Sequence, residues 1–215
     1  MDNLQLSENI PDLEVAMDPR QRRTRDRLHA AVLRLAAERP VTELSVTEVA
    51  AAAGVHRSTL YEHAASPADL LQQALLAELD ELREQLLERS DQDVARAVTE
   101  ITEGVLRHVE RYAAVYRRGL GAGSGEASLH PMLSGHFRES SRRLRELARV
   151  EVRVPVPGVD DDVVADIAGR FLADGTVGAI EGWLEQPELR VEDFMRMYVR
   201  LVPDWWPRDL AVEAR

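Results

Sequence analysis

Two short helical segments joined by a glycine, within residues 45–63, constrain the fold of this chain more than any other feature. Ser45 followed by Glu48 forms a capping box, the arrangement that starts an α-helix. Apolar residues then recur at helical spacing up to Gly54, and glycine enters the left-handed conformation of a tight helix–helix turn without a steric cost. A second short helix follows, anchored from behind by Leu60. The segment therefore predicts a helix-turn-helix.

The outward face of the second helix is almost entirely polar, which fits a helix that reads the major groove of DNA. Arg57, near the helix start, can bond in bidentate fashion to N7 and O6 of guanine, and Ser58 is short enough to approach a base edge. A solvated surface helix would also be polar. However, the capping box, the turn glycine and the Leu60 anchor fall in register, and this agreement favours DNA reading.

The residues around this segment resemble the DNA-binding domain of the tetracycline-repressor (TetR) family of bacterial transcription regulators. The similarity begins at Arg22-Arg23 and Leu28, runs through residues 44–63 and ends at Leu70-Leu71, about a quarter of the chain. The resemblance implies a small all-helical DNA-binding domain, followed by a larger helical domain that binds a small molecule and dimerises.

The resemblance also extends the set of residues expected to contact DNA. Thr59, Tyr61 and His63 suit phosphate contacts, both by position and by comparison with the family. His56 could cap the helix, touch DNA or do neither. A metal pair of His56 and His63 is disfavoured, because two helical turns separate them and no third ligand is evident. The expected DNA-binding set is Ser45, Thr47, His56, Arg57, Ser58, Thr59, Tyr61 and His63.

Three positions depart from the family pattern. The family usually has Ser or Thr where this chain has His56, and Phe where it has Ala64. It has Lys where this chain has Pro67, so a charge that contacts phosphate is missing. The last departure bears on the strength of DNA binding more than on its existence.

The composition excludes many alternative functions. There is no cysteine, which excludes thiol catalysis, disulfide scaffolds and thiolate zinc sites. All 27 basic residues are arginine, so there is no lysine to form a Schiff base or to complete a phosphate-binding loop. No stretch approaches the roughly 18 apolar residues of a membrane span, and residues 1–19 lack the basic residues of a secretory signal. We therefore expect a cytoplasmic protein without a cofactor.

The net charge of −11 is distributed unevenly along the chain. Residues 1–19 hold five acids and no base, and residues 64–215 carry a net charge of −9. Residues 20–63 hold eight arginines against five acids, a net charge of +3. A basic module on an acidic body favours one docking face for DNA and repels the rest from phosphates, although the charge alone would also fit an ordinary surface.

The rest of the chain reads as helices, with no period-2 strand pattern apart from a brief alternation in residues 151–155. The first helix runs from Arg20 to about Glu38, and Ser66-Pro67 starts a long helix to about Arg89 that would join the DNA-reading domain to the body. A further helix is expected to start at Asp91 or Asp93, run through Tyr112 and end at a glycine-rich loop at 119–125. Others are expected over about 129–149, 161–185 and 191–202. The predicted fold class is all-α.

Small residues recur on one face of the helix expected at 161–185, which permits a close crossing of helices. The resemblance implies that the last two helices build a four-helix homodimer interface. The same stripe could instead pack within the chain. The expected interface comprises Gly175, Gly178, Ala179, Gly182, Phe194, Met197, Tyr198 and Leu201.

A ligand site is the least determined part of the sequence. Eight residues combine aromatic faces with hydrogen-bonding groups on helices that the family arranges around its effector cavity, although each could simply be core. They are His108, Tyr112, Tyr116, Met132, His136, Phe137, Phe171 and Trp183. The acidic body favours a neutral or cationic effector over an anionic one.

The sequence thus predicts a dimeric, ligand-responsive transcriptional repressor that binds a palindromic operator in double-stranded DNA and a small-molecule effector. Its expected domains are an acidic tail (1–19), a helix-turn-helix domain (20–65), an effector-binding and dimerisation domain (66–205) and a C-terminal tail (206–215). Two alternatives remain open. One is a helical cytosolic enzyme, for which no G-x-S-x-G or H-E-x-x-H motif is present. The other is a regulator with weak DNA affinity that acts through protein contacts.

Overall fold

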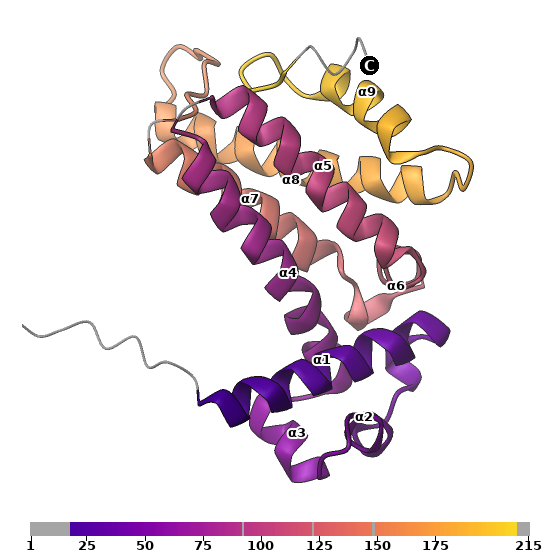
Figure 1. Cartoon of the computed structure of the whole chain (residues 1–215). Helices are drawn as coiled ribbons and strands as arrows, with labels where there is room; N and C mark the ends of the chain where they lie inside the picture. Colours follow the sequence, from indigo (N-terminus) through magenta and orange to yellow (C-terminus); the bar gives the residue numbers. More distant parts are fainter. Residues whose placement is uncertain (1–17, 92, 122, 148, 210–215) are drawn as a thin grey trace, which may run out of the picture.

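The computed structural model describes residues 18–209, except 92, 122 and 148. In these residues there are nine α-helices and two short 3-10 helices, and no strand (Figure 1). The all-helical fold predicted from the sequence is therefore confirmed. None of the helices in the described part of the chain is both long enough and apolar enough to cross a membrane.

The N-terminal unit consists of a long helix that lies across two short ones. The long helix is α1 (Pro19–Glu38), and a short 3-10 turn, η1 (Val41–Glu43), leads from it to α2 (Val46–Ala53) and α3 (Arg57–His63). Figure 1 shows α2 and α3 on the side of α1 that faces away from the rest of the molecule. Apolar side chains from all three helices meet in a core in which Leu28, Val32, Val49 and Leu60 are fully buried.

Helix α4 (Pro67–Arg89) leaves this unit and enters the body. Ser66 caps it by accepting a hydrogen bond of 3.1 Å from the backbone N–H of Asp69, as its sequence predicted. The first turns of α4 pack against α1, and its later turns pack against helices of the body. One continuous apolar core therefore runs through both parts, and α4 is shared between them.

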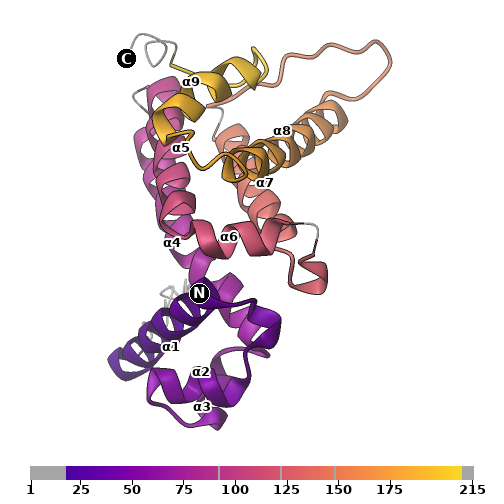
Figure 2. The same cartoon turned by 90° about the vertical axis from the view of Figure 1, so that its right-hand side faces the viewer.

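The body contains five further helices. They are α5 (Val94–Arg111), α6 (Ala113–Leu120), α7 (His130–Glu146), α8 (Asp161–Leu184) and α9 (Val191–Leu201). Helix α4 packs against α5 and α7, α7 packs against α8, and α5 packs against α9. Figure 2 shows α6 lying across the lower ends of α4 and α5, directly above α1.

The sequence predicted one helix through Tyr112 to the glycine-rich loop, and this was wrong. The helix ends at Arg111, and a new helix starts at Ala113 in a different direction (Figure 2). Tyr112 stands between them with a non-helical backbone (φ −105°, ψ 27°). Its hydroxyl donates a 2.6 Å hydrogen bond to Glu78 on α4, so a tertiary contact accompanies the break.

The structure also corrects the expected ends of the chain's elements. Helix α7 ends at Glu146, three residues before the predicted end, and a long loop then leads to α8. Asp18 caps α1, so the last residues of the expected acidic tail belong to a helix start. At the other end, the backbone N–H of Asp209 donates to Thr99 on α5, and Trp206 packs against the core. The expected polar tail is thus partly packed; residues 1–17 and 210–215 lie outside the described residues.

Candidate DNA-reading face and body cavity

The start of α2 is fixed by the capping box that the sequence predicted. The hydroxyl of Ser45 accepts a 3.2 Å hydrogen bond from the backbone N–H of Glu48, and the Glu48 carboxylate accepts from the backbone N–H of Ser45 at 3.1 Å. The guanidinium of Arg39 also pairs with Glu48. The bond from the Ser45 backbone and the bond from Arg39 lower the pKa of Glu48 to about 2. The carboxylate is therefore charged across the physiological range.

The turn between α2 and α3 depends on Gly54, whose backbone is left-handed (φ 64°, ψ 41°). The backbone N–H groups of Gly54 and Val55 bond back to Ala51 and Ala50, which satisfies the last carbonyls of α2. Arg27 on α1 donates a 2.6 Å hydrogen bond to the carbonyl of Gly54. A Cβ at Gly54 would stand 2.5 Å from that guanidinium. Arg27, which was not predicted from the sequence, holds the turn from outside the motif.

Helix α3 presents a polar face to solvent. Arg57 and Ser58 are exposed in its first turn, and Tyr61 is 59% exposed one turn later. Thr59 and His63 are half-buried, as expected for residues beside the anchor Leu60. The exposed side chains thus form a continuous ridge that a DNA groove could receive.

The other expected DNA-contacting residues differ in how available they are. Thr47 is exposed at the start of α2, and His56 precedes α3 without a capping hydrogen bond from its side chain. The hydroxyl of Ser45 is already engaged in the capping box, so its role is to start the helix. Among the described residues, no cluster of three potential metal ligands occurs, at His56 and His63 or elsewhere.

The helices of the body enclose a narrow cavity of about 50 Å³. Apolar walls come from α4, α5, α7 and α8, and Trp206 of the C-terminal segment closes one side. The hydroxyls of Thr176 and Tyr198 lie 2.8 Å apart in a hydrogen bond at its edge. Burial raises the pKa of Tyr198 to about 12, so this phenol stays protonated and can donate or accept.

His136 and Arg83 supply the strongest polar groups of this cavity. An Nη of Arg83 lies 3.4 Å from Nδ1 of His136, and Asp80 lies 3.6 Å from the same nitrogen. Burial, and then the nearby charge of Arg83, lowers the pKa of His136 to about 4. The imidazole is therefore neutral, and its Nδ1 accepts the bond from Arg83. The Nε–H of Arg83 is buried without a hydrogen-bond acceptor in the described chain.

A second polar cluster, made of the buried His108 and Tyr116 and the half-buried Glu78 and Tyr112, lies where α4, α5 and α6 meet. Nδ1 of His108 donates to Glu78 at 3.1 Å, and the hydroxyl of Tyr116 donates to Nε2 of His108 at 2.9 Å. Burial lowers the pKa of His108, so the imidazole is neutral. The Glu78 cluster therefore links α4 to α5 and α6.

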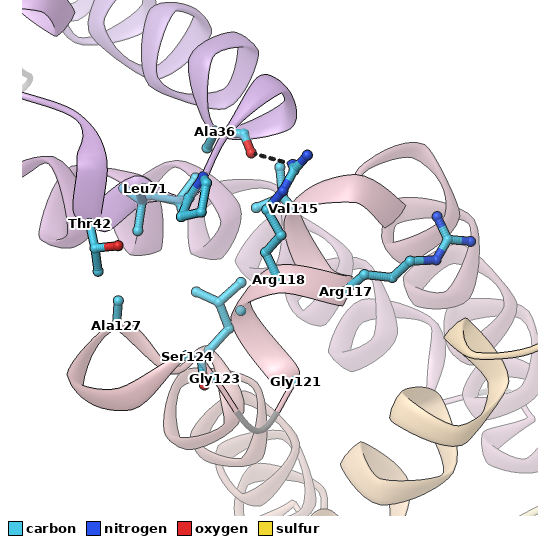
Figure 3. A pocket seen from close by; sticks show the side chains of 14 residues that line it. Ala36, Thr42, Leu71, Val115, Arg117, Arg118, Gly121, Gly123, Ser124 and Ala127 are labelled. Atoms are coloured by element: carbon cyan, nitrogen blue, oxygen red, sulfur yellow. Dashed lines mark hydrogen bonds between the residues drawn. The ribbon is translucent and has the colours of Figure 1, made fainter.

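The DNA-reading unit and the body also meet directly. The end of α1 and η1 lie next to α6 and the loop after it, and a hollow of about 320 Å³ lies between these segments (Figure 3). Thr42 and Ala127 face each other across this hollow, and the Arg118 side chain reaches from α6 to the end of α1. One of its Nη atoms donates to the carbonyls of Ala36 and Ala37.

Comparison with known proteins identifies the N-terminal unit. Residues 28–74, which span most of α1, the helix-turn-helix and the start of α4, match the family described as "Bacterial regulatory proteins, tetR family". Residues 28–74 thus form a DNA-binding domain of the TetR family. The protein is a DNA-binding transcriptional regulator, and the TetR family is one of regulators and not of enzymes. No curated protein is similar enough in sequence to be matched with significance.

Solved structures of TetR-family and related regulators share the whole fold. NalD from Pseudomonas aeruginosa, a secondary repressor of the MexAB-OprM multidrug efflux pump, is 25% identical, with 87% of this chain and 100% of NalD covered at a TM-score of 0.56. A TetR-family regulator from Streptomyces coelicolor is 20% identical over 90% of this chain and 99% of its own (TM-score 0.54). RolR, in complex with the ligand resorcinol, is 19% identical over 89% and 91%, respectively (TM-score 0.53).

The eight residues that the sequence predicted to form one ligand pocket lie in several different places in the structure. His136 and Phe137 line the cavity. His108, Tyr112 and Tyr116 belong to the Glu78 cluster instead, and Met132 and Trp183 are core residues. Phe171 is 72% exposed on the outside of α8, so it lines no interior surface. Sequence reasoning missed Arg83, Thr176, Tyr198 and Trp206, which line the cavity.

The expected dimer residues fall into two groups. Gly175, Gly178 and Gly182 are exposed on α8, and nothing described lies within 4 Å of the position that a Cβ would take at any of them. Met197 and Leu201 are exposed on α9, and Ala179 is half-buried. Phe194 and Tyr198, in contrast, are buried within their own chain. Phe194 stacks on Trp183, and Tyr198 bonds to Thr176, so these two cannot face a partner.

Proposed function

We propose that this TetR-family regulator is a ligand-responsive repressor that binds an inverted-repeat operator as a dimer. The observation that carries the proposal is the spatial separation of its parts. The exposed helix α3 lies at one end of the molecule, whereas the cavity lies within the body. Helix α4 runs from the DNA-reading unit to the cavity (Figure 1). A ligand that changes the packing around α4 can therefore act on DNA binding without touching DNA.

Operator binding would rest on the ridge of α3. Arg57 and Ser58 would read base edges, and Thr59, Tyr61 and His63 would contact phosphates, with Thr47 and His56 beside them. All of these side chains are exposed except Thr59 and His63, which are half-buried, and this supports the assignment. A dimer with two-fold symmetry presents two equal α3 helices, so half-sites should be separated by roughly 34 to 36 Å, one turn of DNA, or by a multiple.

Dimerisation would use the outer face of α8 and α9. The exposed glycines of α8 continue along the same helix face into Val163, Ile167 and Phe171, which are all at least half exposed. Met197 and Leu201 add exposed apolar surface on α9. Large apolar side chains in such a contiguous arrangement mark an interaction surface, and the small residues allow a close crossing with the same helix of a partner.

The effector would enter the body cavity between α4, α5, α7 and α8. Ligand sites usually have about 300 to 1,000 Å³, whereas this cavity holds about 50 Å³. Binding must therefore move the surrounding helices apart, and α4 is one of them. The Nε–H of Arg83, which has no hydrogen-bond acceptor in the described chain, and the hydroxyl of Tyr198 favour a small molecule that carries hydrogen-bond acceptors. Asp80 and Glu84 already offset the charge of Arg83, which favours a neutral one. Resorcinol, the ligand in the RolR complex, is a neutral aromatic diol of this kind.

Movement of α4 would reach DNA through two connections. The first is α4 itself, which packs against α1 at its start. The second is Arg118, which bonds α6 to the end of α1. The two half-sites of the operator demand a fixed spacing between the two α3 helices of a dimer. An effector that binds better to a form with a different spacing therefore lowers DNA affinity, and DNA lowers effector affinity by the same factor.

Salt-dependent binding to the DNA upstream of the protein's own gene tests the proposal. Footprinting of the purified protein should show two protected half-sites related by inversion, and sedimentation should give a dimer. Addition of resorcinol-sized aromatic alcohols to the complex would then identify compounds that release the DNA. Equal protection of any DNA sequence, or a monomer bound to a single half-site, would contradict the proposal.

A further inference from the structure

Helices α7 and α8 form a second hollow, of about 260 Å³, that opens to the outside of the body. The polar residues that line it are Arg138, Glu139, Ser141, Arg142 and Arg145 from α7, and Asp166 and Arg170 from α8. Gly169 lines both this hollow and the cavity in the body, and the two spaces share no other lining residue.

Two buried hydrogen-bond donors of the residues that line this hollow lack partners. Ser141 is only 3% exposed, and its hydroxyl makes no hydrogen bond within the described chain. The Nε–H of Arg145 is likewise buried without an acceptor. Buried polar groups are normally satisfied, so two unpaired donors on residues that line one hollow indicate a missing acceptor. A Cβ at Gly169 would lie 3.7 Å from the Ser141 hydroxyl, at ordinary van der Waals contact.

The charges of the hollow are unbalanced in favour of an anion. Four arginines line it, Arg138, Arg142, Arg145 and Arg170, against two carboxylates, Glu139 and Asp166. Asp166 accepts a 2.9 Å hydrogen bond from Arg170, and Arg142 is paired with Glu139 and with Glu146, which lies outside the lining. Among the lining residues this leaves a surplus of two positive charges, on a body whose net charge is negative.

We propose that this hollow binds the phosphoryl group of a small anionic ligand. A phosphoryl group carries about two negative charges at neutral pH, which matches the surplus. Its three terminal oxygens point in different directions, as do donors that arrive from two helices and from the floor at Ser141. Arginine is also the residue best suited to phosphate, because its planar fork donates two parallel hydrogen bonds.

The site is separate from the proposed effector cavity and does not depend on it. Arg170 and Asp166 flank Ile167 and Phe171, which belong to the exposed stripe of α8. The hollow therefore opens beside the surface proposed for dimerisation. A phosphorylated metabolite bound here would reach the regulator by a route independent of the body cavity.

Isothermal titration of the full-length protein with inorganic phosphate at low ionic strength tests the proposal. We expect one phosphate per chain. Replacing Arg138 or Arg145 with glutamine should weaken binding by about tenfold or more, since each removes a charged hydrogen bond. Ser141→Ala should weaken it by about threefold. Arg153→Gln removes the same charge from an exposed site in the α7–α8 loop, and it should leave the affinity unchanged.

One variant should act in the opposite direction. Asp166→Asn removes the competing carboxylate and frees Arg170, so it should tighten phosphate binding. A gain of affinity cannot arise from misfolding, which makes this the most informative substitution. Malonate, whose carboxylates are planar, should bind more weakly than phosphate.

Three results would overturn the assignment. The first is the absence of phosphate binding to the folded protein. If Arg138→Gln also shifted the monomer–dimer equilibrium, the arginines would instead pair with carboxylates of a second copy. The second is an equal loss of affinity in Arg153→Gln, which would indicate diffuse charge attraction. The third is malonate binding as tightly as phosphate.

Discussion

An Nη of Arg118 donates a 2.8 Å hydrogen bond to the backbone carbonyl of Ala37, in the last turn of α1. The same guanidinium bonds to the carbonyls of Ala36 and Glu38 at 3.0 and 3.2 Å (Figure 3 shows the bond to Ala36). The last carbonyls of a helix lack partners within the helix and carry partial negative charge. The last turn of α1 has no basic residue of its own. A side chain of the body therefore caps a helix of the DNA-reading unit.

Removal of this cap should loosen the junction between the two parts. We expect Arg118→Ala to lower the free energy of unfolding by about 1 kcal/mol, a value discounted for the exposure of the side chain. Arg118→Lys should retain part of the effect, because it keeps the charge but not the planar fork. Urea unfolding measures the change. Arg117→Ala is the matched control for α1, since Arg117 bonds to Leu184 instead; an equal loss in both variants would show that the contact with α1 is unimportant.

The exposed position of Arg57 at the start of α3 leads to a prediction about base selection. Arg57→Ala should relax discrimination at one base in each half-site and cost about 1 to 3 kcal/mol per contact. Binding to a set of operators with single-base changes measures this effect. Arg96→Ala removes an exposed arginine from α5, in the body, and should leave the base preference intact. A uniform loss across all operators would instead assign Arg57 to a phosphate.

The turn at Gly54 should tolerate substitution poorly. Gly54→Ala forces a Cβ into a left-handed backbone and against Arg27, so we expect the free energy of unfolding to fall by about 1 to 2 kcal/mol, with weaker DNA binding. Thermal unfolding and operator binding measure the two effects. Gly123→Ala is the control, because that position has open space and no left-handed backbone. If the two variants lost equal stability, the turn geometry would not be the cause.

The parts of the fold that the sequence predicted are those specified by neighbouring residues. The capping box at Ser45 and Glu48, the turn at Gly54 and the helix start at Ser66-Pro67 depend on residues within a few positions of one another. The break at Tyr112 does not. No glycine or proline marks it, and its contact, Glu78, lies 34 positions earlier, so periodicity alone predicted a continuous helix.

The candidate site was harder to predict because it depends on which helices meet. Helix α9 has apolar residues on two faces, and the sequence could not tell that Phe194 packs within the chain while Met197 faces outward. Arg83 looked like an ordinary surface residue of a long helix, yet it reaches a buried histidine on α7. Arg27 and Arg118 were missed for the same reason, since both act on backbone carbonyls distant in the sequence.

The exposed glycines of α8 allow a test of the dimer surface that leaves the single chain intact. Because nothing described lies within 4 Å of a Cβ at Gly178, a leucine there fits the isolated chain and should clash only with a partner. Gly178→Leu should therefore shift the protein toward monomers in sedimentation and weaken operator binding. Phe171→Glu should do the same by charge. Val154→Glu, at an exposed apolar site in the loop before α8, is the control; dimers in both test variants would place the interface elsewhere.

The buried, neutral state of His136 predicts how stability depends on pH. Its pKa is about 4 in the folded protein, because burial and Arg83 disfavour the charged ring, whereas the unfolded chain has a value near about 6.5. Below pH 6.5 the unfolded state binds the proton more readily, so stability is full above about pH 6.5 and falls as the pH drops toward about 4. The loss should reach about 3 kcal/mol at most. His136→Gln keeps a polar side chain but cannot titrate, so it should flatten this part of the stability profile. Urea unfolding at a series of pH values measures the effect.

His108, whose pKa burial also lowers, should leave a smaller residual slope in that variant. An unchanged slope in His136→Gln would show that protonation of other groups governs acid stability, and that Arg83 and His136 do not keep this imidazole neutral.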